Sequence, residues 1–200
     1  MPNRKKPEMK ERILASADRL FYGTGIRAVG VDAVAAEAGV SKRTLYDYFP
    51  SKDHLIVAYL SRRLSGMPAS DAPLAEQILS AFDRLERTFL NSDFRGCPFV
   101  NAVAEIGERT HPATAIAADF KEQRRVWFRD LLVRLNVENA DALSMQLAIL
   151  LDGALALALV RADPSVARSA RDAARTLLES ANVRLSSAKT VTEGRRRHTT

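Results

Sequence analysis

The chain has 200 residues, a length that is enough for one folded domain or for a small domain joined to a larger one. Hydrophobic residues make up 46% of it and charged residues 27%, a composition that excludes a largely disordered chain. Its single cysteine excludes an intrachain disulfide and a cysteine-rich zinc site. The most apolar run, residues 147–160, is shorter than a membrane span and contains Asp152, and no apolar signal core follows the basic N-terminus. We therefore predict a cytoplasmic protein with no membrane partner.

Positive charge is concentrated at the two ends of the chain. Residues 1–65 contain 12 Lys and Arg against 7 Asp and Glu, a net charge of +5, whereas residues 66–185 contain 14 against 16, a net charge of −2. The last fifteen residues carry +3. A basic first part on a near-neutral body indicates a polyanionic partner for that part, although a solvated basic surface would show the same balance.

Helical patterns begin near the N-terminus, and no segment shows the alternation of a strand. Gly39 supplies a tight turn between the second and third helices, because glycine tolerates a positive φ. Ser41 and Ser51 are placed as N-caps, and Pro50 ends the third helix because it restricts the residue before it. The first part therefore contains predicted helices at residues 8–22, 31–38, 41–49 and 51–64.

Longer helices follow a change of composition at residues 65–68. Prolines stand at or near several of their starts, where the missing N–H costs nothing, and Asp163-Pro164 is the clearest cap. Residues 186–200 have no apolar face and are predicted to be a disordered tail. The helices predicted in this part lie at residues 73–91, 98–108, 112–135, 140–161 and 164–184, so the predicted fold class is all-α.

The helix predicted at residues 140–161 is apolar on nearly every face. Such a helix must be buried all round, either at the centre of the core or in a seam between two subunits. We favour a dimer seam shared with the last helix, because Gly153 and its neighbouring alanines permit close approach. Asp152 within this helix needs a partner, either an arginine across the seam or a polar group of a ligand. The residues predicted for the seam are Leu147, Leu151, Leu155, Ala158 and Leu159.

Residues 39–55, GVSKRTLYDYFPSKDHL, have the proportions of the end of a helix-turn-helix, in which the second helix enters the major groove of DNA. Leu45 and Phe49 are four residues apart and are expected to face the core, which leaves the first turn of this helix free to reach base edges. An arginine there can contact guanine through two hydrogen bonds, and tyrosine hydroxyls suit phosphate oxygens. Helical turns of this composition also occur on inert surfaces, so the residues alone leave both interpretations open.

Residues 25–55, GIRAVGVDAVAAEAGVSKRTLYDYFPSKDHL, resemble the DNA-binding segment of the TetR family of transcriptional regulators. The resemblance lies in the Ala-Gly-Val-Ser turn, the Thr-Leu-Tyr-x-Tyr-Phe helix and the Ser-Lys-Asp that opens the fourth helix, and it covers roughly residues 10–60. Gly30 departs from the family pattern, in which Ser or Thr commonly caps the second helix. The DNA contacts that the resemblance implies are Ser41, Lys42, Arg43, Thr44, Tyr46 and Tyr48, with Lys52 on phosphate.

The same resemblance implies an all-helical protein of about nine helices, a homodimer formed through the last two long helices, and a cavity for a small-molecule effector in the second domain. On this basis residues 1–8 are a flexible basic arm, and residues 9–50 are a helix-turn-helix domain of three helices. Residues 51–185 are the effector-binding and dimerisation domain, which begins with a linking helix at residues 51–65.

The segment FRGCPFVNAVAEI, residues 94–106, also resembles a segment found in some members of this family. Cys97 precedes Pro98 and is placed as the N-cap of the sixth helix, where amides and the helix dipole would lower a thiol pKa. A sensor of oxidants or electrophiles is one interpretation, and a small buried apolar side chain is the alternative. Other apolar residues recur at helical spacing and suit either the core or the lining of the effector cavity. Together with Cys97, the predicted lining is Phe82, Leu85, Phe89, Phe99, Val103, Trp127, Phe128 and Leu131.

These features predict a ligand-responsive transcriptional regulator, most simply a repressor, that binds a palindromic site on double-stranded DNA as a dimer and is released by an unidentified small molecule. An enzyme is the competing class. The sequence offers no phosphate loop, no metal-ligand cluster and no nucleophile with a recognisable base, so we expect neither catalysis nor a cofactor nor a metal. A third class, a DNA-binding protein without an effector, would show no preference for one palindrome over random duplex.

Overall fold

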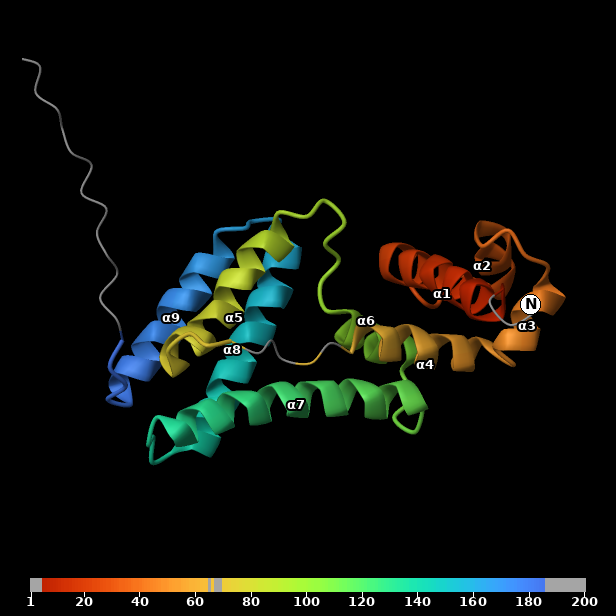
Figure 1. Ribbon diagram of the computed structural model, residues 1–200. Coiled ribbons are helices and arrows are strands. Elements are labelled where there is room, and N and C mark those ends of the chain that lie inside the picture. The colour runs from red at the N-terminus through yellow and green to blue at the C-terminus, as the bar shows by residue number, and fades with distance from the viewer. Residues whose placement is uncertain (1–4, 65, 67–69, 186–200) are drawn as a thin grey trace, which may run out of the picture.

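The computed structural model describes residues 5–64, 66 and 70–185, and the regular structure within them is entirely α-helical (Figure 1). This confirms the predicted all-α class and the expected number of about nine helices. The predicted tail at residues 186–200 lies outside the described residues, as do residues 1–4 of the predicted basic arm. The helices are α1 (Lys5–Thr24), α2 (Val31–Glu37), α3 (Lys42–Tyr48), α4 (Lys52–Arg63), α5 (Leu74–Phe89), α6 (Pro98–Ile106), α7 (Pro112–Arg134), α8 (Ala140–Arg161) and α9 (Val166–Ser180).

Two helix starts differ from the sequence prediction. Helix α1 begins at Lys5, so residues 5–8 are helical and not part of a flexible arm. Proline is tolerated in the first turn of a helix, and Glu8 lies in that turn, where a carboxylate favours the positive end of the helix dipole. Helix α9 begins after Ser165 and not at residue 164, and the Asp163 side chain accepts a hydrogen bond from the Ser165 N–H at 2.9 Å.

The helices form two hydrophobic cores. The first core contains the buried faces of α1–α4, and residues of α6 and of the first turns of α7 complete it. The second core is formed by α5, the second half of α7, α8 and α9. Figure 1 shows the two groups at opposite ends of the molecule, with α4, α6 and the start of α7 between them. Helices α4 and α7 therefore connect the N-terminal helices to the body.

Helix α8 has one face in the second core and one face exposed. Leu147 is completely buried, and Leu151 and Ala158 are also buried within the subunit. Residues that one subunit already buries offer no surface to a second, so these three were wrongly assigned to the dimer seam. Leu155 is half-buried and Leu159 is exposed. The large exposed apolar side chains of α8 are Met145, Ile149, Leu157, Leu159 and Val160.

Asp152 has its partners within the same chain. Its carboxylate accepts a hydrogen bond from Lys121 Nζ at 2.6 Å and another from the Arg124 guanidinium, both on α7. Arg124 is only 7% exposed, and a buried cation requires such a carboxylate. The prediction of a partner across a subunit seam is therefore not needed to account for Asp152.

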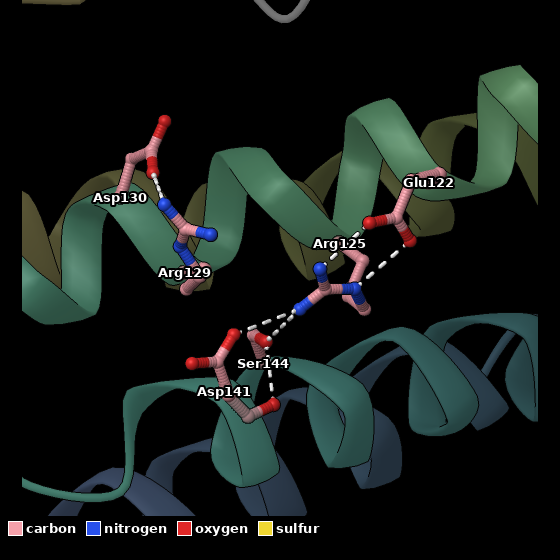
Figure 2. Close-up of polar contacts among 6 residues, drawn as sticks. All are labelled: Glu122, Arg125, Arg129, Asp130, Asp141 and Ser144. Carbon is pink, nitrogen blue, oxygen red and sulfur yellow. Dashed lines mark hydrogen bonds and ion pairs between the residues drawn. The ribbon is translucent and has the colours of Figure 1, made fainter.

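Helix α8 is attached to α7 by a second polar cluster, which Figure 2 shows around Arg125. The Arg125 guanidinium donates to both carboxylate oxygens of Glu122 at 2.6 and 2.9 Å, and across the helix pair to Asp141 and Ser144 at 3.3 and 3.2 Å. The hydrogen bond to Glu122 raises the pKa of Arg125, and the same bond lowers the pKa of Glu122. Arg125 thus holds the start of α8 against α7.

Helix α8 is also the one helix among the described residues that is long and apolar enough to cross a membrane. With 22 residues it is longer than the run of residues 147–160, so length alone does not exclude a span. One such helix is weak evidence for a span, because a helix that packs in a protein core passes the same test. The buried face of α8 is part of the second core.

Candidate DNA-binding surface

The turn between α2 and α3 is held by backbone hydrogen bonds. The Ala38 N–H donates to Val34 at 2.9 Å and the Val40 N–H donates to Ala35 at 2.9 Å, which closes the end of α2. Gly39 between them has a φ of +62°, a conformation that favours glycine. The tight turn that the sequence predicts at Gly39 is confirmed.

Helix α3 packs onto the first core through Leu45 and Phe49, which are both almost fully buried. The side chain of Ser41 accepts a hydrogen bond from the Thr44 N–H at 3.0 Å, so Ser41 is the N-cap that the sequence predicts. Phe49 ends the helix in an extended conformation just before Pro50. These contacts fix the orientation of a helix of only seven residues.

The other side of α3 faces solvent. Ser41, Lys42 and Arg43 are exposed, Thr44 is half-buried and its hydroxyl lies 2.8 Å from that of Ser41. Tyr46 is 39% exposed, whereas Tyr48 is half-buried. The residues predicted to contact DNA, apart from Lys52, thus lie together on α3 and its N-cap, with the first turn open to a ligand.

Lys42 is paired with Asp32 of α2. The Lys42 Nζ lies 2.9 Å from Asp32 Oδ1 and 3.0 Å from Oδ2. The hydrogen bond to Asp32 and the charge of the carboxylate both raise the pKa of Lys42. Lys42 remains protonated, but a phosphate must compete with Asp32 for it. Arg43, which has no described ion pair, is better placed to reach a base edge.

The start of α4 adds a second group of donors beside α3. Ser51 accepts a hydrogen bond from the His54 N–H at 3.2 Å and is the N-cap of α4, as predicted. Lys52 lies in the first turn, where unpaired N–H groups and the helix dipole favour an anion. Because α4 continues through the first core and contacts α7, this helix start is connected directly to the body.

Two further residues bear on this surface. The Lys10 ammonium lies over the Phe49 ring, 5.8 Å from its centroid, so α1 places an additional positive charge beside the end of α3. The excess of basic residues before position 65 is the only feature of the sequence that indicates this additional positive charge.

Gly30 is the N-cap of α2 and makes no side-chain cap hydrogen bond, as expected where the usual hydroxyl is missing.

The residues predicted to line an effector cavity are divided between the two cores. Phe82, Leu85, Phe89, Phe128 and Leu131 lie in the second core, with Trp127 half-buried against it. Cys97 and Phe99 lie in the first core, with Val103 half-buried against it. The surface cavities among the described residues include ones of about 570, 880 and 290 Å³, and none of these is lined by these side chains.

Cys97 occupies the N-cap position of α6, as predicted, but its side chain makes no cap hydrogen bond. The residue is 9% exposed and packs with the apolar side chains of the first core. Its surroundings are those of a small buried apolar side chain, the alternative to a sensor thiol.

Helix α1 is followed by two short helices, α2 and α3. Helix α3 is held by its apolar side and presents serine, basic and tyrosine side chains to solvent, and this arrangement defines a helix-turn-helix protein of the DNA-binding class. Comparison with known proteins agrees. The family model described as bacterial regulatory proteins, tetR family, matches residues 13–59. The transcriptional repressor KstR of Mycobacterium tuberculosis is 40% identical over 78 residues, which are 39% of this chain and 36% of KstR. The transcriptional activator FasR of Mycolicibacterium smegmatis is 37% identical over 62 residues, 31% of this chain and 28% of FasR.

The similarity to solved structures extends over the body as well. A TetR-type transcriptional regulator from Streptomyces avermitilis is 33% identical with a TM-score of 0.79, and the match covers 88% of this chain and 99% of that one. A TetR-family regulator from Streptomyces coelicolor is 30% identical with the same TM-score over 88% and 96% of the two chains. The chain belongs to the TetR family of transcriptional regulators, which confirms the resemblance found in the sequence. The matches to KstR and FasR, by contrast, span only 36% of KstR and 28% of FasR.

Proposed function

We propose that the protein is a cytoplasmic, ligand-responsive repressor that binds a palindromic operator as a homodimer. The observation that carries the proposal is the arrangement of α3, whose first turn presents Ser41, Lys42, Arg43 and Thr44 while its apolar residues are buried. In this arrangement Arg43 and Thr44 contact base edges, Tyr46 and Tyr48 contact the backbone, and Lys52 holds a phosphate at the start of α4. Two such helices, one from each subunit, lie about one DNA turn apart, roughly 34 Å.

The exposed face of α8 supports the homodimer. Ile149 is 64% exposed and Val160 is 83% exposed, with Met145 and Leu157 beside them on one apolar surface. A contiguous apolar surface on a long helix favours association with a second subunit. Gly153 lies on this face with no atom near the position of its absent Cβ, which permits a partner helix to approach closely. This surface replaces the buried residues Leu147, Leu151 and Ala158 in the proposed interface.

Release by a small molecule rests on the connection between the body and the DNA-binding helices. An effector that binds beside α4 and α7 changes the position of α4, and with it Lys52 and the neighbouring α3. By linkage, an effector that weakens DNA binding must itself bind the DNA-bound form more weakly. The relatives include both a named repressor and a named activator, and repression is the simpler outcome because a bound dimer excludes other proteins from its site.

Selection of bound duplexes from a random DNA pool, at near-physiological salt, tests the proposal. Recovery of a two-fold symmetric site that outcompetes random duplex supports a dimeric regulator that reads sequence. If a folded protein recovers only random DNA, with a steep salt dependence, it binds phosphate without reading sequence and the proposal is wrong.

A further inference from the structure

The tyrosine near the end of α1 connects the DNA-binding helices to the body through its hydroxyl. The Tyr22 hydroxyl accepts a hydrogen bond from the Arg95 N–H at 2.9 Å and donates one to the Gly96 carbonyl at 3.1 Å. Arg95 and Gly96 belong to the loop between α5 and α6, more than seventy residues away in the sequence. One hydroxyl thus uses both its donor and its acceptor capacity on a single loop of the body.

That loop is in turn fixed to the helices of the body. The Asn101 side chain on α6 donates a hydrogen bond to the Arg95 carbonyl at 2.6 Å. Gly96 has a φ of +81°, and a Cβ atom on it would lie 3.0 Å from Leu159 Cδ2 of α8. The loop is therefore in direct contact with α8, the helix whose exposed face carries the proposed dimer surface. Gly96 is therefore the one residue that lies between the Tyr22 hydroxyl and α8.

A second connection lies beside the first. The carboxylate of Glu105, on α6, accepts a hydrogen bond from the Arg27 N–H at 2.8 Å, in the turn between α1 and α2. Gly25 has a φ of +107°, and its absent Cβ would lie 3.0 Å from Glu105 Oε2, so the carboxylate sits directly on the backbone of that turn. Sequence separation again exceeds seventy residues.

These hydrogen bonds lie beside two surface cavities. A cavity of about 880 Å³ and a second of about 290 Å³ are both lined by Tyr22 and Arg95, and the smaller is also lined by Glu105 and Leu159. The aromatic ring of Tyr22 is covered by the Arg63 guanidinium of α4 at 4.3 Å from its centroid, and Arg63 also pairs with Asp18 of α1. The ring therefore belongs to the DNA-binding helices, and only its hydroxyl reaches across to the loop.

We propose that Tyr22 and Glu105 are positioning residues that hold the DNA-binding helices at one orientation relative to α8, and so set the spacing at which a dimer reads its two half-sites. This inference rests on the proposed function, namely that two subunits read one symmetric site. The apolar contacts of α6 in the first core hold these helices together, and the hydrogen bonds of Tyr22 and Glu105 add directional contacts beside two surface cavities. Without them each α3 helix samples more positions, and ordering two of them on one duplex costs conformational entropy.

The test compares Tyr22→Phe and Glu105→Ala with the wild-type protein on three duplexes: the selected palindrome, a palindrome with one base pair added between its half-sites, and a single half-site. Each variant is expected to bind the palindrome about three- to tenfold more weakly, the loss expected from one or two hydrogen bonds. The preference of each variant for the native spacing over the altered spacing should also fall. Binding to the single half-site should remain at the wild-type level, because neither residue belongs to the recognition surface.

Two matched variants separate positioning from a general loss of structure. Glu105→Gln keeps an acceptor for the Arg27 N–H and should bind like wild type. Glu138→Ala, an exposed glutamate between α7 and α8, should have no effect on any duplex. Thermal unfolding of every variant confirms that the protein remains folded.

Two results would overturn the inference. The first is equal weakening on the palindrome and the half-site, which indicates damage to the DNA-binding helices themselves. The second is wild-type affinity and wild-type spacing preference in both Tyr22→Phe and Glu105→Ala. If the wild-type protein itself selects no symmetric site, both the proposed function and this inference are wrong. That result is distinguishable from the other two because it is obtained before any variant is made.

Discussion

The surface of α3 and the exposed face of α8 are built in opposite ways. In α3, two buried side chains, Leu45 and Phe49, and a serine cap hold a short helix so that polar side chains at its first turn project outward. In α8, apolar side chains surround the helix, and the neighbouring helices alone determine which of them are buried. The comparison teaches that a DNA-reading surface is specified by local chemistry, whereas a subunit surface on an apolar helix is specified by tertiary packing.

The largest expected effect separates the two faces of α8. Leu147→Ala removes a completely buried side chain from the second core and should lower the free energy of unfolding by about 2–5 kcal/mol. Ile149→Ala, on the exposed face of the same helix, should change the stability of the isolated subunit far less. Chemical denaturation of both variants at low protein concentration measures the difference. Equal losses would mean that the two faces of α8 are not distinct.

The proposed subunit surface can be broken without damage to the core. Ile149→Glu places a charge on the exposed apolar face and should raise the dissociation constant of the dimer at least about tenfold, because an interface with a buried unpaired charge is strongly disfavoured. Sedimentation equilibrium measures the constant. Val133→Glu, which changes an exposed apolar residue of α7, is the matched control and should leave the dimer intact. An unchanged dimer in Ile149→Glu would place the interface elsewhere.

The roles of two basic residues at the DNA surface are expected to differ in kind. Arg43→Ala should cost about 1–3 kcal/mol against the preferred base and relax specificity at one position of the site. Lys52→Ala should weaken binding to every sequence alike and reduce the slope of affinity against salt by about one charge. Titration of single-base variants of the selected site at two salt concentrations distinguishes them. Should both changes act equally on every sequence, Arg43 does not read a base.

The smallest expected effect concerns the cluster around Arg125. The pKa of Glu122 is lowered in the folded protein by its hydrogen bond to Arg125, so the carboxylate contributes stability above its unfolded pKa, and this contribution is lost as pH falls through the folded pKa. Glu122→Gln should therefore be slightly less stable than wild type at neutral pH, with the difference disappearing in acid. The Glu122 side chain is 56% exposed, so solvent screens the pair and the effect should be small. A difference that grows in acid would have the wrong sign for this account.

Much of the DNA-binding unit was predictable because its determinants are close together in the sequence. Ser41 and Ser51 cap the helices that follow them, Gly39 turns the chain, and Pro50 stops α3, each through contacts within four residues. The burial of Leu45 and Phe49 follows from their helical spacing. The family pattern in the same segment added the class of protein, although which atoms meet DNA remains a prediction.

The rest depends on contacts between distant segments. In α8, periodicity cannot choose between Leu147 and Ile149, because both are apolar and the helix has no polar face to orient it. Cys97 and Phe99 pack on the first core and not in the body, since α6 crosses to the DNA-binding helices after a loop. The bonds from Tyr22 to Gly96 and from Asp152 to α7 have no local signal in the sequence.

The most direct test of the account is hydrogen–deuterium exchange of the protein with and without its selected palindromic duplex. The account predicts slower exchange in α3 and at the start of α4 on binding DNA, with the exposed face of α8 unchanged because the dimer already covers it. Protection confined to the body, with α3 exchanging as in the free protein, would contradict the assignment of α3 as the surface that reads DNA.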